Sequence, residues 1–155
     1  METVKQVSVF LENKPGRLAK VLSALAHEKV NITALTVMDS HEHSVLRLVS
    51  SDLPRSAQVL KALSIPHAET DVLLVELRNQ PGALAHVCEI LGAEHINIDY
   101  AYCSSGGRNG RVVGVFKVSN TEKAMRVLSE GANNVGRRRA EKRQLRDRRS
   151  YQLPG

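Results

Sequence analysis

An internal repeat constrains the fold of this chain more than any other feature of its sequence. The segment Asn13–Ala19 reads Asn-Lys-Pro-Gly-Arg-Leu-Ala, and 66 residues later Asn79–Ala85 reads Asn-Gln-Pro-Gly-Ala-Leu-Ala. Aligned at that spacing without a gap, residues 13–32 and 79–98 are identical at ten of twenty positions. Self-similarity at a fixed spacing indicates a repeated structural unit. The sequence therefore predicts a duplication, in which each copy folds in the same way.

The first strand and first helix of each copy follow from the spacing of apolar residues. Val7, Val9 and Leu11 occupy alternate positions, as in a half-buried strand. Pro15 is expected in the first turn of the following helix, where its missing N–H costs nothing. Apolar residues then recur at helical spacing on one face, at Leu18, Val21, Leu22 and Leu25 in the first copy and at Leu84, Val87, Cys88 and Leu91 in the second. This stripe places the Cys88 side chain in the core.

The remaining elements complete the same order twice. Strands over 32–38 and 44–49, a helix over about 54–63 and a short strand near 67–70 finish the first copy. The second copy has strands over 98–103 and 111–118 and a helix over about 121–130, with Ser119 and Glu122 at capping-box spacing. Residues 131–136 are small and polar, so we expect an incomplete last strand there. The predicted fold class is α+β, a ferredoxin-like βαββαβ unit duplicated in tandem.

The domain boundaries follow from this repeat and from the absence of a Gly/Ser-rich or Pro-rich linker between the copies. We expect one domain over residues 1–70, a second over 71–136 and a basic C-terminal tail over 137–155. A unit of about 66 residues buries only ~60% of its unfolded surface, so the two should pack side by side. Unpaired sheet edges also favour self-association, and a homodimer is expected.

The net charge of +6 resides in the tail. Residues 137–149 contain eight Arg and Lys and two acids, which leaves fourteen basic and fourteen acidic residues in the rest of the chain. Nucleic acid is therefore an expected partner only through that tail. The chain has no long apolar run, no secretory signal pattern and only Cys88 and Cys103. We expect a cytoplasmic protein that does not bind membranes.

The repeated motif resembles that of the ACT domain. That family has Asn-x-Pro-Gly-x-Leu between its first strand and first helix, and Asn-Ile eighteen residues after that Asn. Both copies show it, as Asn13 with Asn31-Ile32 and as Asn79 with Asn97-Ile98. The likeness covers about residues 4–130 and is strongest to small stand-alone proteins of two tandem ACT domains.

The resemblance implies regulatory binding of a small molecule, usually an amino acid, at interfaces between paired ACT domains, without a cofactor. In the regulatory domain of bacterial phosphoglycerate dehydrogenases, the loop Asn and the Asn before Ile both contact the bound amino acid. Leu11 and Leu77 stand here where that relative uses a His, so the resemblance does not identify serine as the ligand. The implied ligand-binding residues are Asn13, Pro15, Gly16, Arg17, Leu18, Asn31 and Ile32 in the first copy and Asn79, Pro81, Gly82, Ala83, Leu84, Asn97 and Ile98 in the second.

The chemistry of the loops supports the same location. A helix N-terminus presents unpaired N–H groups, which suit a carboxylate. Glycine lets a ligand approach the backbone closely, and Asn offers both a donor and an acceptor. Arg17 in the first turn opposes the helix dipole and is expected to be an exposed, hydrated side chain. We expect the second loop, which has Ala83 in its place, to form the better site.

Other functions are disfavoured by what the motif lacks. No catalytic triad, paired carboxylates or metal-ligand motif is spaced suggestively, so we expect no catalytic or metal-binding residues and no enzyme activity. Acylphosphatases and RNA-recognition domains share the order of elements, but the phosphate loop of the former and the aromatic strands of the latter are missing. The remaining alternative is a protein- or nucleic-acid-interaction module with vestigial ligand sites and a basic docking tail.

Overall fold

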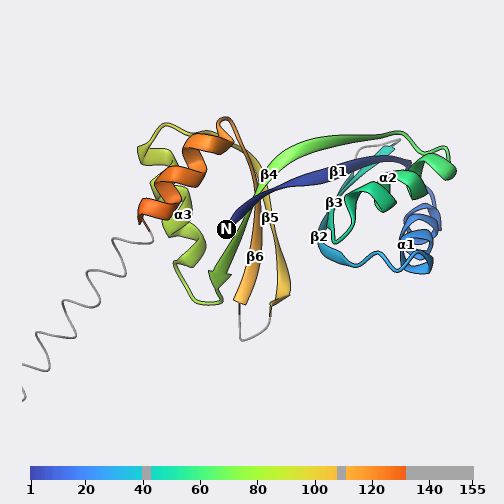
Figure 1. Cartoon of the computed structure of the whole chain (residues 1–155), viewed down its shortest axis with the longest axis horizontal. Helices are drawn as coiled ribbons and strands as arrows, with labels where there is room; N and C mark the ends of the chain where they lie inside the picture. Colours follow the sequence, from blue (N-terminus) through green and yellow to red (C-terminus); the bar gives the residue numbers. More distant parts are fainter. Residues whose placement is uncertain (40–42, 108–110, 132–155) are drawn as a thin grey trace, which may run out of the picture.

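The computed structural model of the chain describes residues 1–39, 43–107 and 111–131. These residues form one six-stranded antiparallel sheet, in the order β2-β3-β1-β4-β6-β5, with a pair of helices at each end (Figure 1). The elements are β1 (Glu2–Glu12), α1 (Arg17–His27), β2 (Ile32–Asp39), β3 (His43–Ser50), α2 (Leu53–Ala62), β4 (His67–Arg78), α3 (Ala83–Ala93), β5 (Ile98–Gly107), β6 (Arg111–Val118) and a last helix over 121–131. The predicted fold, a duplicated βαββαβ unit, is confirmed.

The two long strands β1 and β4 join the units at the centre of the sheet. They pair antiparallel from Glu2 opposite Leu74 to Val9 opposite His67. Lys5 pairs with Asp71, which is also its counterpart 66 residues later, so a pseudo-twofold axis passes between these two residues. Their side chains form an ion pair of 2.9 Å. In a symmetric dimer of two identical units, the same residue would face itself at this axis and like charges would repel. In the duplicated chain, Lys5 faces Asp71 and the charges are opposite.

Each of these strands serves both units. β3 pairs with the second half of β1, from Val7 to Glu12, and β6 pairs with the second half of β4, from Leu73 to Arg78. The short strand expected near 67–70 is thus continuous with the first strand of the second unit. In the first unit, the start of β4 pairs with the second half of β1. In the second unit, the start of β1 takes the equivalent place and pairs with β4. The incomplete last strand expected over 131–136 falls outside the described residues, apart from Gly131, which ends the last helix.

Three apolar clusters stabilise this arrangement. One lies under α1 and α2 and includes Val9, Leu25 and Leu48, and another lies under α3 and the last helix and includes Leu91 and Phe116. The third lies on the opposite, helix-free face and receives residues from every strand of the described sheet, namely Ala34, Val49, Val72 and Val115 with Val4, Leu74 and Tyr102. The end strands β2 and β5 contact each other, so the sheet curls around this third cluster. Its two halves therefore share a core.

A buried polar group crosses that shared core. The fully buried Gln6 amide donates to the hydroxyl of Tyr100 at 2.8 Å and to that of Ser8 at 3.1 Å. The Tyr102 hydroxyl donates to the Gln6 carbonyl oxygen at 3.0 Å. Burial, and to a lesser degree Tyr100, raises the pKa of Tyr102, so that hydroxyl remains a donor. Arg47 stacks over the Tyr100 ring at 4.0 Å, so contacts from β1, β3 and β5 meet between the units.

Two helix predictions need correction. The last helix is capped by Asn120, whose side chain accepts from the Lys123 N–H at 2.9 Å, and not by Ser119. The Ser119 hydroxyl instead accepts from the backbone N–H of Asn97. Cys88 is exposed, and so is Leu84, at 44%. The face of α3 that packs against the sheet is narrower than the apolar stripe of the helix. The buried residues of α3 are therefore Val87 and Leu91.

No helix in the described residues is long and apolar enough to cross a membrane. The basic tail over 137–155 lies outside the described residues.

Candidate functional site

The two Asn-x-Pro-Gly loops have the same backbone. Each connects the end of a central strand, β1 or β4, to a helix whose N-cap is the motif glycine. Gly16 has φ 82° and Gly82 has φ 84°, in the left-handed region that glycine favours. Pro15 and Pro81 lie in the turn before the glycine, not in the first helical turn as predicted, because the helices begin only at Arg17 and Ala83.

The helix ends at these loops present free backbone donors. A glycine N-cap has no side chain, and neither helix has a side-chain cap bond. The Ala83 N–H donates to the Gln80 carbonyl oxygen at 3.3 Å. Among the described residues, the N–H groups of Leu84 and Ala85 have no acceptor. The loops can therefore hold an anion, as the sequence predicts.

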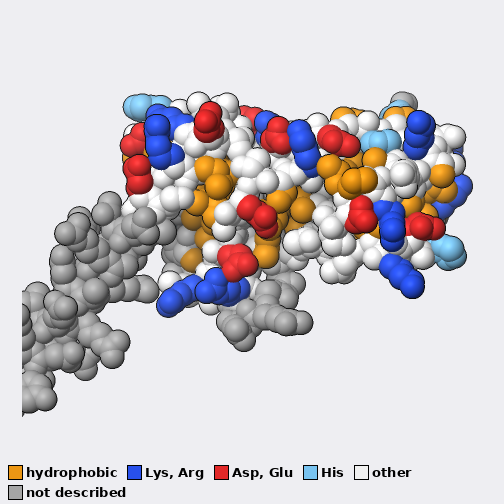
Figure 2. Space-filling model, viewed as in Figure 1, with side chains coloured by type: hydrophobic (Ala, Val, Ile, Leu, Met, Phe, Trp, Pro, Cys, Tyr) orange, Lys and Arg blue, Asp and Glu red, His pale blue; other side chains and the backbone are white. Residues whose placement is uncertain are grey.

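A groove of about 730 Å³ lies beside the second loop. It runs between the edge of β4, the helix α3 and the last helix, beyond the point where β1 begins. Its walls are apolar and consist of Met1, Val75, Leu77, Val87, Ile90 and Leu128, and Pro81, Gly82 and Ala83 of the loop line one end. Figure 2 shows hydrophobic side chains gathered on this face over α3 and the neighbouring strands. The volume falls within the range usual for small-molecule sites.

The charged and polar residues at the groove are Glu76, Arg78, Gln80 and His86. Glu76 accepts from Arg111 at 2.7 Å through one carboxylate oxygen. Arg78 forms no ion pair with any residue that the structure describes. The groove thus combines an unpaired cation, free N–H groups and apolar walls.

The first loop is closed by a neighbouring segment. Its pocket measures only about 190 Å³, and residues 63–66 line it together with Phe10 and Glu12. The Phe10 N–H donates to the Pro66 carbonyl oxygen at 3.0 Å. Phe10 is the counterpart of Glu76, so residues 63–66 border in the first unit a position that, among the described residues, lines the groove in the second.

The charged side chains of the first loop pair with one another. Glu12 accepts from Arg17 at 2.8 Å and lies 3.1 Å from Lys14. The hydrogen bonds from Lys14 and then Arg17 hold the pKa of Glu12 below its ordinary value. Arg17 is therefore ion-paired and not simply hydrated, which corrects the prediction. At the equivalent positions the second loop carries Arg78 and Ala83.

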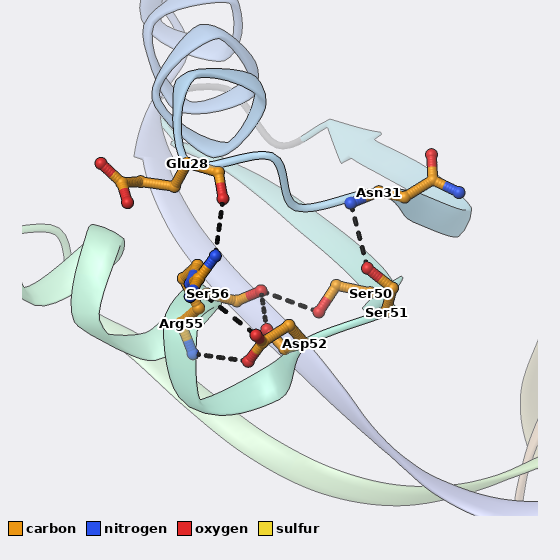
Figure 3. A network of polar contacts seen from close by, with 7 residues as sticks. All are labelled: Glu28, Asn31, Ser50, Ser51, Asp52, Arg55 and Ser56. Atoms are coloured by element: carbon orange, nitrogen blue, oxygen red, sulfur yellow. Dashed lines mark hydrogen bonds and ion pairs between the residues drawn. The ribbon is translucent and has the colours of Figure 1, made fainter.

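The second Asn of each motif lies at the far end of the helix. The Asn31 N–H donates to the Ser51 hydroxyl at 3.1 Å, and the Ser51 N–H donates to the Asn31 carbonyl oxygen at 2.9 Å. In Figure 3 the Asn31 side chain points away from the surrounding network, in which Asp52 caps α2 and Arg55 donates to the Glu28 carbonyl oxygen. The backbone of Asn97 makes the same bonds to Ser119.

This arrangement separates the predicted residues within a unit. Asn13 and Asn31 flank an 11-residue helix, so they are roughly 16 Å apart along its axis. A single amino acid cannot contact both within one unit. The Asn97 side chain donates to Asp99 at 2.8 Å, and Ile32 and Ile98 pack against the helix-side cores. The structure brings together only the loop residues, and Asn79 does not line the groove.

Sequence reasoning missed most of the groove. Its walls come from β4, α3 and the last helix, and no local pattern marks Val75, Ile90 or Leu128 as neighbours. One signal was present in the repeat, since Glu12 and Arg17 in the first copy become Arg78 and Ala83 in the second. Among the described residues, no group of three or more His, Cys, Asp or Glu could hold a metal ion.

Comparison with known proteins supports the duplicated fold. The family model described as an ACT domain pair matches residues 2–137. A Bacteroides thetaiotaomicron protein of solved structure is 37% identical, with 84% of this chain and 89% of that chain covered and a TM-score of 0.78. The ligand-free regulatory subunit of aspartate kinase from Thermus thermophilus is 15% identical over 84% of this chain and 97% of its own, with a TM-score of 0.59. No curated protein matches the chain.

Proposed function

The chain belongs to the family of ACT domain pairs, and from that premise we propose that it is a non-catalytic, cytoplasmic regulatory protein whose second unit binds an amino acid. ACT domains are regulatory, and the Thermus thermophilus neighbour is a regulatory subunit. The observation that carries the proposal is the contrast between the two loops. Within the part of the chain that the structure describes, only the second one combines a groove with an Arg78 that has no ion pair and a helix N-terminus with free N–H groups.

The bound amino acid is oriented by charge. Its carboxylate lies against the Arg78 guanidinium and the N–H groups of Leu84 and Ala85, because each of these donors lacks an acceptor among the described residues. Its ammonium group donates to the side-chain oxygen of Gln80, which lines the groove. Charge-assisted hydrogen bonds of this kind are roughly twice as strong as neutral ones. We expect no such site at the first loop, since Glu12 pairs with both Lys14 and Arg17 and residues 63–66 line its smaller pocket.

Calorimetry with each of the twenty amino acids tests this function directly. Binding to the folded state alone raises the free energy of unfolding by about 2.7 kcal/mol at a hundredfold excess over the dissociation constant. Arg78→Ala should weaken binding at least about tenfold, since a hydrogen bond to a charged group contributes about 1.5–3 kcal/mol. Glu12→Ala at the equivalent position of the first unit is the control and should leave the affinity unchanged. No heat and no thermal shift with any amino acid would contradict the proposal and favour the interaction module.

We also propose that the chain forms a homodimer through β2. Leu35, Val37 and Met38 are all exposed, at 40–48%, along this end strand. The counterparts of Leu35 and Val37 in β5 are the smaller Ala101 and Cys103. A second copy would also place the Asn31 of one chain beside a loop of the other, as the family resemblance implies. Sedimentation should show a dimer that Val37→Asp dissociates, whereas Cys103→Asp at the equivalent position should have no effect.

A further inference from the structure

The groove beside the second loop has two chemically distinct parts. Its walls are formed by hydrocarbon side chains from three elements, including Val75, Val87, Ile90 and Leu128. Its charged groups come from the end of β4, where Arg78 has no partner among the described residues and Glu76 is already paired with Arg111. A ligand that matches this groove is charged at one end and apolar at the other.

We propose that the groove selects amino acids with a hydrophobic side chain of three or more carbon atoms, such as valine, leucine, isoleucine or methionine. This inference rests on the proposed function and defines the class of ligand. The carboxylate of the ligand meets Arg78, and its side chain lies against Val87, Ile90 and Leu128. Each methylene that leaves water should tighten binding roughly fourfold, so leucine should bind at least tenfold more tightly than alanine.

Polar and charged side chains are rejected by the same surfaces. The apolar walls offer no hydrogen-bond partner to a hydroxyl or an amide, and a buried polar group without a partner is unfavourable. Among the described residues that line the groove, Arg78 is the one Arg or Lys, and the ligand carboxylate already occupies it, so an acidic side chain gains no further ion pair. Glu76 is the one acidic residue in that lining and is bound to Arg111, so a basic side chain finds no free carboxylate there. Serine, aspartate and lysine should therefore bind at least tenfold more weakly than leucine.

The first unit shows how well an apolar segment fits this position. There the counterpart of the groove is occupied by residues 63–66, which include Leu63 and Ile65. Both of these residues pack against the first helix-side core. The second unit has kept the corresponding core, with Val87 and Leu91 in place of Val21 and Leu25, and Val87 lies where this core borders the groove. A hydrophobic ligand side chain would complete that core.

Calorimetry of the full chain with alanine, valine, leucine, serine, aspartate, lysine and leucinol tests the inference. We expect affinity to rise from alanine to valine to leucine, and to be lost for leucinol, which keeps the side chain and amine but lacks the carboxylate. Equal binding of serine or aspartate and leucine would overturn the hydrophobic selectivity and leave the proposed function intact. Equal binding of leucinol and leucine would overturn the role of the carboxylate. Failure of every amino acid would overturn the proposed function itself.

A substitution in the wall provides a second readout. Ile90→Thr keeps a β-branched shape but places a hydroxyl on the groove wall, so it should weaken leucine binding at least fourfold and change alanine binding little. Ala24→Ser, at the position of α1 equivalent to Ile90, also places a hydroxyl on a helix but outside the groove, and should alter neither affinity. A loss of the same size for leucine and alanine in Ile90→Thr would show a general disturbance of the fold and contradict the proposed contact.

Discussion

The two loops of this protein share a motif and a backbone but differ in what surrounds them. Gly16 and Gly82 adopt the same left-handed conformation and begin helices of the same length. At the first loop, residues 63–66 line the pocket and Glu12 pairs with the two cations, whereas the second borders a larger groove and an Arg78 that has no ion pair among the described residues. The motif therefore determines the turn, and residues outside it determine whether the turn forms a site.

This difference arises from how the units share strands. The last strand of the first unit is the start of β4, and the chain that leads into it covers the first loop. The corresponding place in the second unit is occupied by the start of β1, whose first paired residue, Glu2, lies opposite Leu74. The residues of β4 that follow Leu74, including Val75 and Leu77, line the groove. A duplication of sequence has produced two unequal environments.

Separating the units should have the largest effect. Cleavage of the gene after Asp71 divides β4 in the middle and removes the strand that each unit receives from the other. Because a unit of about 66 residues buries only ~60% of its unfolded surface, we expect two insoluble or molten fragments without a cooperative transition. Circular dichroism during heating measures this. Sharp, independent melting of each fragment would show that the comparison concerns two autonomous domains.

The shared polar core should show the next largest effect. Gln6 is equivalent to Val72, and both are fully buried, yet only Gln6 bonds to Tyr100 and Tyr102. Gln6→Val should lower the free energy of unfolding by about 1–3 kcal/mol, because it leaves two tyrosine hydroxyls without their partner. Urea denaturation measures the loss.

A matched variant separates hydrogen bonding from packing at this position. The triple change Gln6→Val, Tyr100→Phe and Tyr102→Phe removes both partners, and replacing both partners by apolar groups can be nearly neutral. We expect most of the lost stability to return. If the triple variant is less stable than Gln6→Val alone, the tyrosine hydroxyls are satisfied by water and the amide has a different role.

The repeat predicted the fold well because each copy carries its own local signals. Alternation at Val7, Val9 and Leu11 predicts strand β1, and the helical spacing from Leu18 to Leu25 predicts α1. The matching segment 66 residues later shows the same local signals a second time. Sequence could not show that β1 and β4 each serve two units, since that depends on a register between residues such as Lys5 and Asp71 that are far apart in the chain.

The candidate site was predicted only in part. The loop glycines mark the helix N-termini, but Cys88 and Leu84 lie outside the core because tertiary packing decides how much of a helix is covered. The pairing of Asn79 with Asn97 looked local in the sequence, while a whole helix separates them. Arg78 lies one residue before the motif, and only the comparison with Glu12 reveals its unpaired charge.

The two glycines provide a matched test of the loops. A Cβ at Gly16 or Gly82 would meet nothing within 4 Å, so the cost of a valine arises from the positive φ alone. We expect Gly16→Val and Gly82→Val each to lower the free energy of unfolding by about 1–2 kcal/mol. Only Gly82→Val should also abolish amino-acid binding, by blocking the approach to the Leu84 N–H. Loss of binding in both variants would contradict the assignment of one site per chain.

Removing the charge of Glu12, which pairs with Lys14 and Arg17, should have the smallest effect on the free energy of unfolding. This effect should depend on pH. Lys14 and Arg17 hold the pKa of Glu12 below its ordinary value of 4.5 in the folded state. The carboxylate therefore adds stability above that ordinary value, and this contribution disappears as the pH falls through the folded pKa. Glu12→Gln lacks the charge, so its stability should be slightly below that of the wild type at neutral pH and equal to it in acid.

Salt dependence shows whether this difference is electrostatic. Glu12 and Arg17 are about half exposed and Lys14 about two-thirds, so salt should screen their attraction and reduce the difference at neutral pH. Urea denaturation of both proteins at neutral and acid pH, in low and high salt, measures it. Arg17→Ala introduces the residue that the second loop has at this position, Ala83. In that background, Glu12→Gln should lower the free energy of unfolding by less than it does in the wild type. A difference that persists in acid and in high salt would mean that Glu12 acts through packing, and the two loops would then differ in shape and not in charge.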